Sequence, residues 1–149
     1  MPVPLFDINL IAVGRIKDHQ FLEKINDFST RLRFDTRFTV HEIKDSDKET
    51  EGKKICQLIE QTAGFTITLS EEGQEFTSED FTRFLQKCGK KITFCIGGPH
   101  GISEQVKKKS NSVFALSKMT FTHEIARLLL VEQIYRVVSI IKNRGYHKA

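Results

Sequence analysis

The stretch that decides the fold is KITFCIGGPHG, residues 91–101. Its first six residues, 91–96, are nearly continuous in apolar character, as in a strand that is buried on both faces of a parallel sheet. The turn at 97–101 follows directly, and its glycines permit positive φ angles and close approach of the backbone to a ligand. This turn matches neither the GxGxxG dinucleotide fingerprint nor the GxxxxGK(S/T) phosphate loop. A tight turn without a ligand and a binding loop of another kind both fit it.

Outward from this strand, strand patterns alternate with helix patterns along the chain. Apolar and β-branched runs predict strands at residues 5–13, 37–43, 65–69, 91–96 and 112–116. Apolar residues at helical spacing predict helices at residues 18–34, 49–63, 77–88, 103–110 and 122–142. We therefore expect an α/β fold with a mainly parallel five-stranded sheet flanked by helices.

Single residues suggest where the predicted helices begin and end. Gly64 stops the second helix, Ser78 is the expected N-cap of the third, and Gly89 ends the third. Thr122 is placed to cap the last helix. Ligands of parallel sheets bind on the loops after the strands, so the loops to inspect are 70–74, 97–103 and 117–122.

The composition sets the class of protein. A chain of 149 residues with 39% hydrophobic and 28% charged residues predicts one globular domain, residues 1–149. The beginning of the chain lacks the features of a secretory signal, and no apolar stretch is long enough to span a membrane. Three scattered cysteines and five scattered histidines predict neither disulfides nor a metal site, and favour a reducing cytoplasm.

Charge is distributed unevenly. Residues 105–149 hold 9 of the 23 Lys and Arg residues but only 2 of the 19 acids. Such asymmetry suggests that the C-terminal third faces a polyanion, although solvated lysines that keep the chain soluble fit as well. The last predicted helix is apolar over more than the stripe that packing on one sheet requires. It is either enclosed within the monomer or covered by a second copy, and we expect a homodimer.

Two further segments could carry chemistry. In residues 116–127, a strand ends in a polar loop and His123 and Arg127 share one face of the helix that follows. The tail offers an aromatic ring at Tyr146, an imidazole at His147 and an ammonium at Lys148. A capped helix with a solvated arginine, and a frayed chain end, explain the same residues without function.

Taken together, four segments resemble the ribosomal large subunit pseudouridine methyltransferase H family, a small branch of the SPOUT class of knotted methyltransferases. They are INLIAVGRIK at 8–17, FCIGGPHG at 94–101, ALSKMTFTHEIARLLLVEQIYR at 115–136 and YHK at 146–148. The resemblance covers almost the whole chain, and the third segment is long and specific. It implies a C-terminal trefoil knot, a rare exception to unknotted topology.

The resemblance implies S-adenosylmethionine as cofactor, held by Leu69, Gly97, Leu116, Ser117, Lys118, Met119, Thr120 and Phe121. It implies methylation of N3 of a pseudouridine in large-subunit ribosomal RNA on the assembled ribosome, by a homodimer whose active site lies at the subunit interface. His147 and Arg127 are the hypotheses for base handling and substrate orientation, with Tyr146 stacking. Lys148 and His123 would contact the RNA, and no metal is involved.

The chain departs from the family pattern at four places. Thr122 and Gly145 replace the usual prolines, and Ser70 replaces the usual acidic residue. An additional residue, Ala149, follows the lysine that usually ends the pattern. A missing acid at Ser70 leaves any role of that acid in doubt, and Gly145 loosens the tail.

Rival functions are an RNA-binding module without methyl transfer, a methyltransferase of the same class acting on transfer RNA, and a Rossmann-type enzyme. The last lacks its glycine fingerprint, and the second usually needs extra RNA-binding segments.

Overall fold

Five parallel strands form one sheet in the computed structural model, which describes residues 3–148. The strands are β1 (Asp7–Val13), β2 (Arg37–Ile43), β3 (Phe65–Gln74), β4 (Lys91–Ile96) and β5 (Ser112–Phe114). Their spatial order is β2-β1-β4-β3-β5, and every pairing is parallel. The predicted α/β fold with a parallel five-stranded sheet is confirmed.

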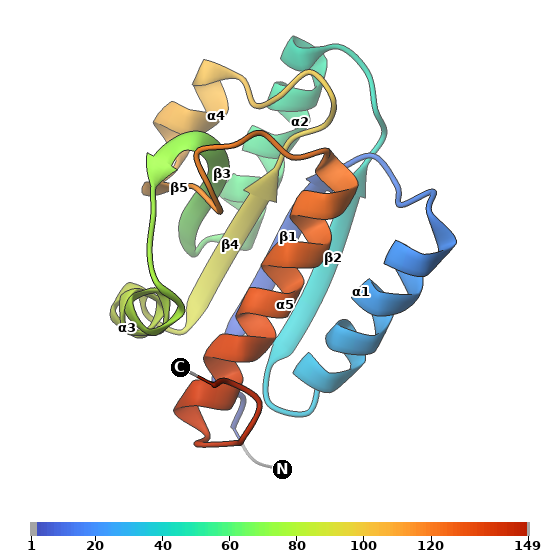
Figure 1. Cartoon of the computed structure of the whole chain (residues 1–149). Coiled ribbons are helices and arrows are strands. Elements are labelled where there is room, and N and C mark those ends of the chain that lie inside the picture. The colour runs from blue at the N-terminus through green and yellow to red at the C-terminus, as the bar shows by residue number, and fades with distance from the viewer. Residues whose placement is uncertain (1–2, 149) are drawn as a thin grey trace.

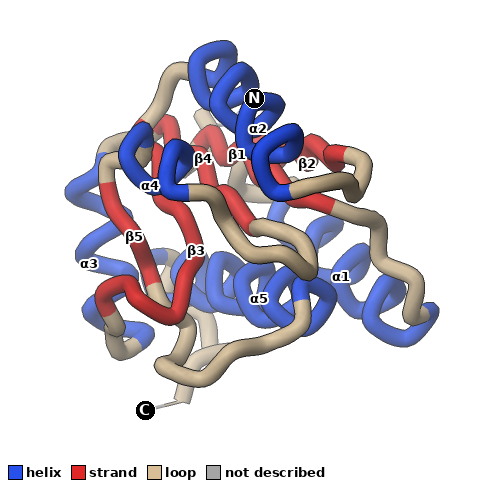
Figure 2. The backbone as a smooth tube through the Cα atoms, turned by 90° about the horizontal axis from the view of Figure 1, so that it is seen from above, coloured by secondary structure: helices blue, strands red, loops and turns tan. Residues whose placement is uncertain are grey.

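Helices cover both faces of the sheet (Figures 1 and 2). They are α1 (His19–Leu32), α2 (Lys48–Thr62), α3 (Ser78–Cys88), α4 (Glu104–Lys109) and α5 (His123–Ile141). Helices α1, α3 and α5 pack on one face and α2 and α4 on the other. In β1, Leu10 points to the first group and Ile11 to the second, so alternate residues of one strand serve two separate cores.

Two predicted helix ends were wrong. The N-cap of α3 is Thr77, whose side chain accepts a hydrogen bond from the Asp80 N–H, while the Ser78 hydroxyl donates to Gln133 of α5. Ala63 takes the left-handed conformation that ends α2, with φ 47°. Gly64 is required for space instead, because a Cβ there would lie 2.8 Å from the carbonyl oxygen of Lys91.

The sheet differs from the prediction at one edge. Strand β3 runs on through the segment 70–74 that was expected to be a loop, with a register shift between Leu69 and Gln74 where it pairs with β5. Strand β5 is only three residues long. Gly73 permits this close pairing, since a Cβ on it would meet the Val113 backbone at 2.6 Å.

Helix α5 is enclosed on three sides, by the sheet, by α1 and by α3. This packing accounts for much of its apolar surface within one chain. Leu129 and Phe121 nevertheless remain 37% exposed beside a shallow apolar hollow. Across residues 3–148, none of the helices has the length and apolar character that a membrane crossing requires.

Candidate active site

A cavity of about 990 Å³ opens at the carboxyl ends of the strands. Its walls come from the start of α1, from β3, from the turn after β4, from α4 and from the segment that joins β5 to α5. Figure 2 looks onto this end of the sheet, where the connecting segments converge. The cavity is at the upper end of the size range of small-molecule sites, so it has room for a cofactor and part of a second reactant.

Most residues expected to bind the cofactor line this cavity. They are Leu69, Gly97, Leu116, Ser117, Met119, Thr120 and Phe121. Lys118 lies in the same segment but its side chain is exposed to solvent and does not contribute to the lining. The structure thus brings together three stretches that are far apart in the sequence.

The turn after β4 has the shape of a narrow cradle that depends on glycine. Gly98 and Gly101 form an antiparallel bridge, and Gly101 has a φ of 79°. A Cβ on Gly97 would lie 2.7 Å from the Gly101 carbonyl oxygen, and one on Gly98 would lie 2.8 Å from Val13 Cγ1. Any side chain at these two positions would push the turn out of place.

The opposite wall, the segment from β5 to α5, contributes backbone groups to the cavity as well as side chains. Among residues 3–148, the N–H groups of Leu116 and Thr120, which both line the cavity, have no hydrogen-bond acceptor in the protein. The Met119 N–H is bound by the Ser117 hydroxyl at 3.0 Å. Unpaired backbone groups beside a cavity need water or a ligand, and a flat heterocycle with donors and acceptors along its edge suits them.

The charged side chains of the cavity are predominantly acidic. The carboxylates are Asp18, Glu71, Glu72, Glu104 and Glu124, and the lysines are Lys48 and Lys107. One lysine, Lys107, is bound to Glu72 at 3.1 Å and to Glu104 at 3.4 Å. The excess of negative charge favours a ligand that carries positive charge.

The first turn of α5 lines one wall of the cavity and is bonded to the segment that follows β1. Glu124 Oε1 accepts hydrogen bonds from the N–H groups of Lys17 and Asp18, each at 3.1 Å. The His123 ring packs on Gly14, where a Cβ would lie 3.2 Å from His123 Cε1. Glycine at position 14 therefore lets the imidazole reach the cavity lining.

Arg127 belongs to the same wall but lies behind it. It is only 3% exposed, and its guanidinium donates to Glu42 Oε2 and to the Gly14 carbonyl oxygen, both at 2.6 Å. These bonds tie α5 to the end of β2 and to the end of β1. The geometry therefore gives Arg127 a positioning role within its own chain, and it has no direct access to the cavity.

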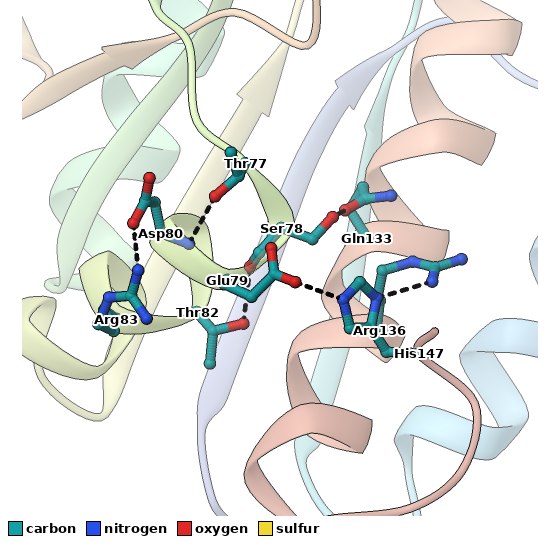
Figure 3. A network of polar contacts seen from close by, with 9 residues as sticks. All are labelled: Thr77, Ser78, Glu79, Asp80, Thr82, Arg83, Gln133, Arg136 and His147. Atoms are coloured by element: carbon teal, nitrogen blue, oxygen red, sulfur yellow. Dashed lines mark hydrogen bonds and ion pairs between the residues drawn. The ribbon is translucent and has the colours of Figure 1, made fainter. Parts of the chain in front are cut away.

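The imidazole of His147 lies at the other end of α5, between an acid and a base (Figure 3). Its Nε2 lies 2.8 Å from Glu79 Oε1, and its Nδ1 lies 3.0 Å from Arg136 Nη1. Because an arginine only donates, Nδ1 carries no proton here and Nε2–H donates to Glu79. The hydrogen bond with His147 lowers the pKa of Glu79, which keeps that acceptor ionised.

Tyr146 is held beside this network. Its hydroxyl donates to Glu132 Oε2 at 2.7 Å, and the same oxygen accepts from Arg136 Nη2 at 2.5 Å. Burial, with the bond to Glu132, raises the pKa of Tyr146 to about 12, so the phenol stays protonated at neutral pH. The ring packs edge-on against Tyr135 with 4.9 Å between centroids. Lys148 is exposed next to it.

The basic C-terminal third is less positive in the fold than in the sequence. Five of its nine basic side chains pair with acids, namely Lys107, Lys109, Arg127, Arg136 and Arg144. Four of the acids, Asp35, Glu42, Glu60 and Glu72, come from the first half of the chain. The net positive charge is therefore confined to smaller areas than the sequence implied.

Several residues of the site gave no sequence signal. Asp18 and Phe21 of the first helix region line the cavity, and Glu42 reaches Arg127 across 85 positions of sequence. The i, i+4 spacing of Glu132 and Arg136 was a detectable signal, and their ion pair supports the tail.

No group of three or more potential metal ligands occurs within residues 3–148.

Known proteins resemble this chain over nearly its whole length. Residues 6–147 match a family model described as predicted SPOUT methyltransferase. The chain is 37% identical to the ribosomal RNA large subunit methyltransferase H of Parabacteroides distasonis, over 94% of this chain and 98% of that protein. It is also 37% identical to the protein of the same name from Prochlorococcus marinus, over 93% and 94% of the two chains.

A solved structure shares the fold. The structure of a probable methylase family protein from Haemophilus influenzae Rd KW20 superposes with a TM-score of 0.57 at 10% identity. It covers 97% of this chain and 72% of that one. At this identity the likeness concerns the fold alone.

Proposed function

Because the chain belongs to the SPOUT methyltransferase family, we propose that it methylates N3 of a pseudouridine in large-subunit ribosomal RNA. The methyl donor of this proposal is S-adenosylmethionine, and the substrate is the assembled ribosome. The names of the relatives support the RNA class. The observation that carries the proposal is the acidic cavity lined by backbone groups at the carboxyl ends of the strands.

The residues of this cavity fit S-adenosylmethionine. Unpaired N–H groups at Leu116 and Thr120 suit the adenine edge, and the glycine cradle at Gly97 admits a ligand close to the backbone. The excess of carboxylates suits the cationic sulfonium and ammonium groups. When bound, this cofactor supplies an electrophilic methyl group attached to a positively charged sulfur.

The tail of one chain lies away from its own cavity. From His123 to Ile141, α5 rises about 27 Å, and the tail folds back beyond its far end. There His147 is hydrogen-bonded to Glu79 and Arg136, and neither of these residues lines the cavity. For the cavity and the tail to act together, a second copy would bring its tail to the cavity of the first. The exposed Leu129 and Phe121, next to the cavity, supply an apolar contact for such a homodimer.

The tail residues would then handle the base. With the methyl acceptor in place, His147 Nδ1 is the atom suited to take the imide proton of N3, once Arg136 has moved off it. Tyr146 would stack on or orient the base, and Lys148 would pair with a phosphate. His123, in the cavity lining, would contact the RNA from the cofactor side. Arg127 would orient the substrate indirectly, by fixing this wall.

The proposal treats residues 1–149 as one methyltransferase domain with the trefoil knot of its class. The chain leaves β5 at the sheet edge and crosses the strand ends to α5, beside β1, a path that is compatible with such a knot (Figure 1). Thr122 caps α5 in place of the usual proline, with its side chain accepting from the Ile125 N–H. The turn needed at this point is therefore kept.

The test is transfer of labelled methyl from S-adenosylmethionine to ribosomes that lack the mark, with separated subunits and free transfer RNA alongside. The proposal predicts label at one pseudouridine of large-subunit RNA, mapped by mass spectrometry. Label in transfer RNA would show that the enzyme methylates transfer RNA and would reject ribosomal RNA as the substrate. Cofactor binding without any label would reject these RNAs as substrates, and absence of cofactor binding would favour an RNA-binding module.

A further inference from the structure

Phe34, in the turn between α1 and β2, holds its ring in solvent. The residue is 80% exposed, more than any other large hydrophobic residue in the described chain. A single exposed apolar residue is ordinary on a protein surface and carries no argument alone. Three further features of Phe34 point to a binding role. They are the rigidity of its turn, the nearby charges and its position next to the tail.

The turn that carries Phe34 is rigid. The N–H and the hydroxyl of Thr36 both donate to the Leu32 carbonyl oxygen, at 2.9 and 2.8 Å. The Asp35 carbonyl accepts from the Leu5 N–H at 2.7 Å, and the Asp35 carboxylate accepts two bonds from Arg144 at 2.7 and 3.0 Å. These bonds fix the backbone next to Phe34, so ordering this turn on binding would cost little backbone entropy.

Three arginines, Arg31, Arg33 and Arg37, lie within three residues of Phe34 in the sequence. Arg33 lies before Phe34 and has no acidic partner among the described residues, its Nε donating to the Phe38 carbonyl instead. Arg37 is 71% exposed on its side chain and only 3.8 Å from Asp7. Arg31 pairs with Asp27 at 3.3 Å on the surface. An acid in the turn itself, Asp35, is already occupied by Arg144. Four arginines, counting Arg144, stand against three carboxylates, so this area keeps a small net positive charge beside the exposed ring.

This area is continuous with the C-terminal tail. The Arg31 guanidinium lies 5.7 Å from the centroids of both Phe28 and Tyr135. The Tyr146 ring packs on the same two rings, at 6.3 and 4.9 Å. Figure 1 shows the α1–β2 turn and the C-terminal segment at the same end of the molecule. The turn therefore lies at the same end of the molecule as Tyr146 and His147.

We propose that the arginine corner, defined as Arg31, Arg33, Phe34 and Arg37, is a docking surface for the substrate RNA. Phe34 stacks on an unpaired base next to the base that the tail handles, and the arginines pair with the flanking phosphates. Proteins commonly bind single-stranded RNA with aromatic rings that stack on bases and with nearby arginines that pair with phosphates. This inference rests on the proposed function, because it takes the tail as part of the active site.

The experiment compares Phe34→Ala and the double variant Arg33→Gln/Arg37→Gln with the wild type on ribosomes that lack the mark. We expect Phe34→Ala to weaken ribosome binding and raise KM about tenfold, since one stacked base is worth roughly 5- to 150-fold in affinity. Phe34→Trp should retain the wild-type KM. The double variant should also lower the salt dependence of log Kd by about one to two units of slope.

Two controls separate RNA docking from other effects. Lys53→Gln/Lys54→Gln removes two exposed lysines from α2, on the opposite face of the sheet, and should leave KM unchanged. Cofactor affinity by calorimetry and the melting temperature should be unchanged in all variants. Sedimentation then reports the oligomeric state.

Each remaining outcome decides the question. Wild-type KM in Phe34→Ala, with methyl transfer by the wild type intact, overturns the docking surface and leaves the proposed function standing. A variant that dissociates into monomers while binding RNA normally overturns it in favour of a protein contact. A wild type that neither binds nor methylates ribosomes overturns the proposed function and the docking surface together.

Discussion

The two ends of the sheet are built by different means. At the carboxyl end, the cavity is shaped by glycines and by backbone groups, with Gly97 and the segment 116–121 as its main walls. At the amino end, the tail is fixed by side chains, through the network of Glu79, Arg136 and His147. Main-chain geometry tolerates many side-chain changes but no added Cβ, whereas a side-chain network is lost with one substitution. The two ends should therefore respond to opposite kinds of mutation.

The largest expected effect is at the tail. His147→Ala should lower methyl transfer about 100- to 10,000-fold, because the variant lacks the proton acceptor proposed for N3. Cofactor affinity should stay within about twofold of wild type, since the tail lies at the far end of α5 from the cavity of its own chain. Single-turnover transfer and calorimetry measure the two quantities. Undiminished transfer would remove His147 from the mechanism.

A side chain added at Gly97, at the carboxyl end of the sheet, should mainly lower the affinity for the cofactor. Gly97→Val places side-chain atoms against the Gly101 carbonyl oxygen, 2.7 Å from the Cβ position, so the cradle must open. We expect cofactor affinity to fall about 100-fold, or about 2.7 kcal/mol. Gly145→Ala is the matched control, because a Cβ there meets nothing within 4 Å. Equal affinities in the two variants would show that the cradle does not hold the cofactor.

The next effect concerns stability. Arg127→Lys keeps the charge but cannot bridge both Glu42 and the Gly14 carbonyl, so a buried polar group loses its partner. We expect the free energy of unfolding to fall by about 2 kcal/mol, measured by denaturant titration. Arg83→Lys, in an exposed pair with Asp80, should change it by less than about 0.5 kcal/mol. Wild-type stability with lost transfer would instead assign Arg127 a direct contact with substrate.

The smallest effect is a pH dependence at the amino end. Hydrogen bonds from Arg144 hold the pKa of Asp35 below its ordinary value of 3.8, although burial opposes this. A lowered pKa stabilises the fold above pH 3.8, and the gain is lost as the pH falls through the pKa of the folded state. Asp35→Asn should therefore cost up to about 1 kcal/mol at pH 6 and progressively less below pH 4. A cost independent of pH would exclude the ion pair as its cause.

Local patterns were sufficient for most of the fold. The apolar run 91–96 and its glycine turn gave the central strand and the cavity loop, because a buried parallel strand has little freedom in composition. The choice between Thr77 and Ser78 as cap was not decidable locally, since both hydroxyls can cap. Tertiary packing decided it, because Gln133 of α5 binds the Ser78 hydroxyl.

The site was only partly predictable for the same reason. Residues next to strand ends, such as Leu69 and Gly97, follow from the strand order and from the family resemblance. Contacts between distant segments do not follow from either of these. The burial of Arg127 in an ion pair with Glu42 was therefore not predicted from the sequence. The distance between His147 and the cavity was also hidden, because it depends on the length and placement of α5.

The central claim is that the cavity of one chain works with the tail of another. We would mix His147→Ala with Gly97→Val, allow the subunits to exchange, and measure methyl transfer to ribosomes that lack the mark. Each mixed dimer has one site with an intact cavity and an intact tail, so equal mixing predicts about a quarter of wild-type activity. Activity no higher than that of the two variants alone, with exchange verified by mass spectrometry, would contradict the account.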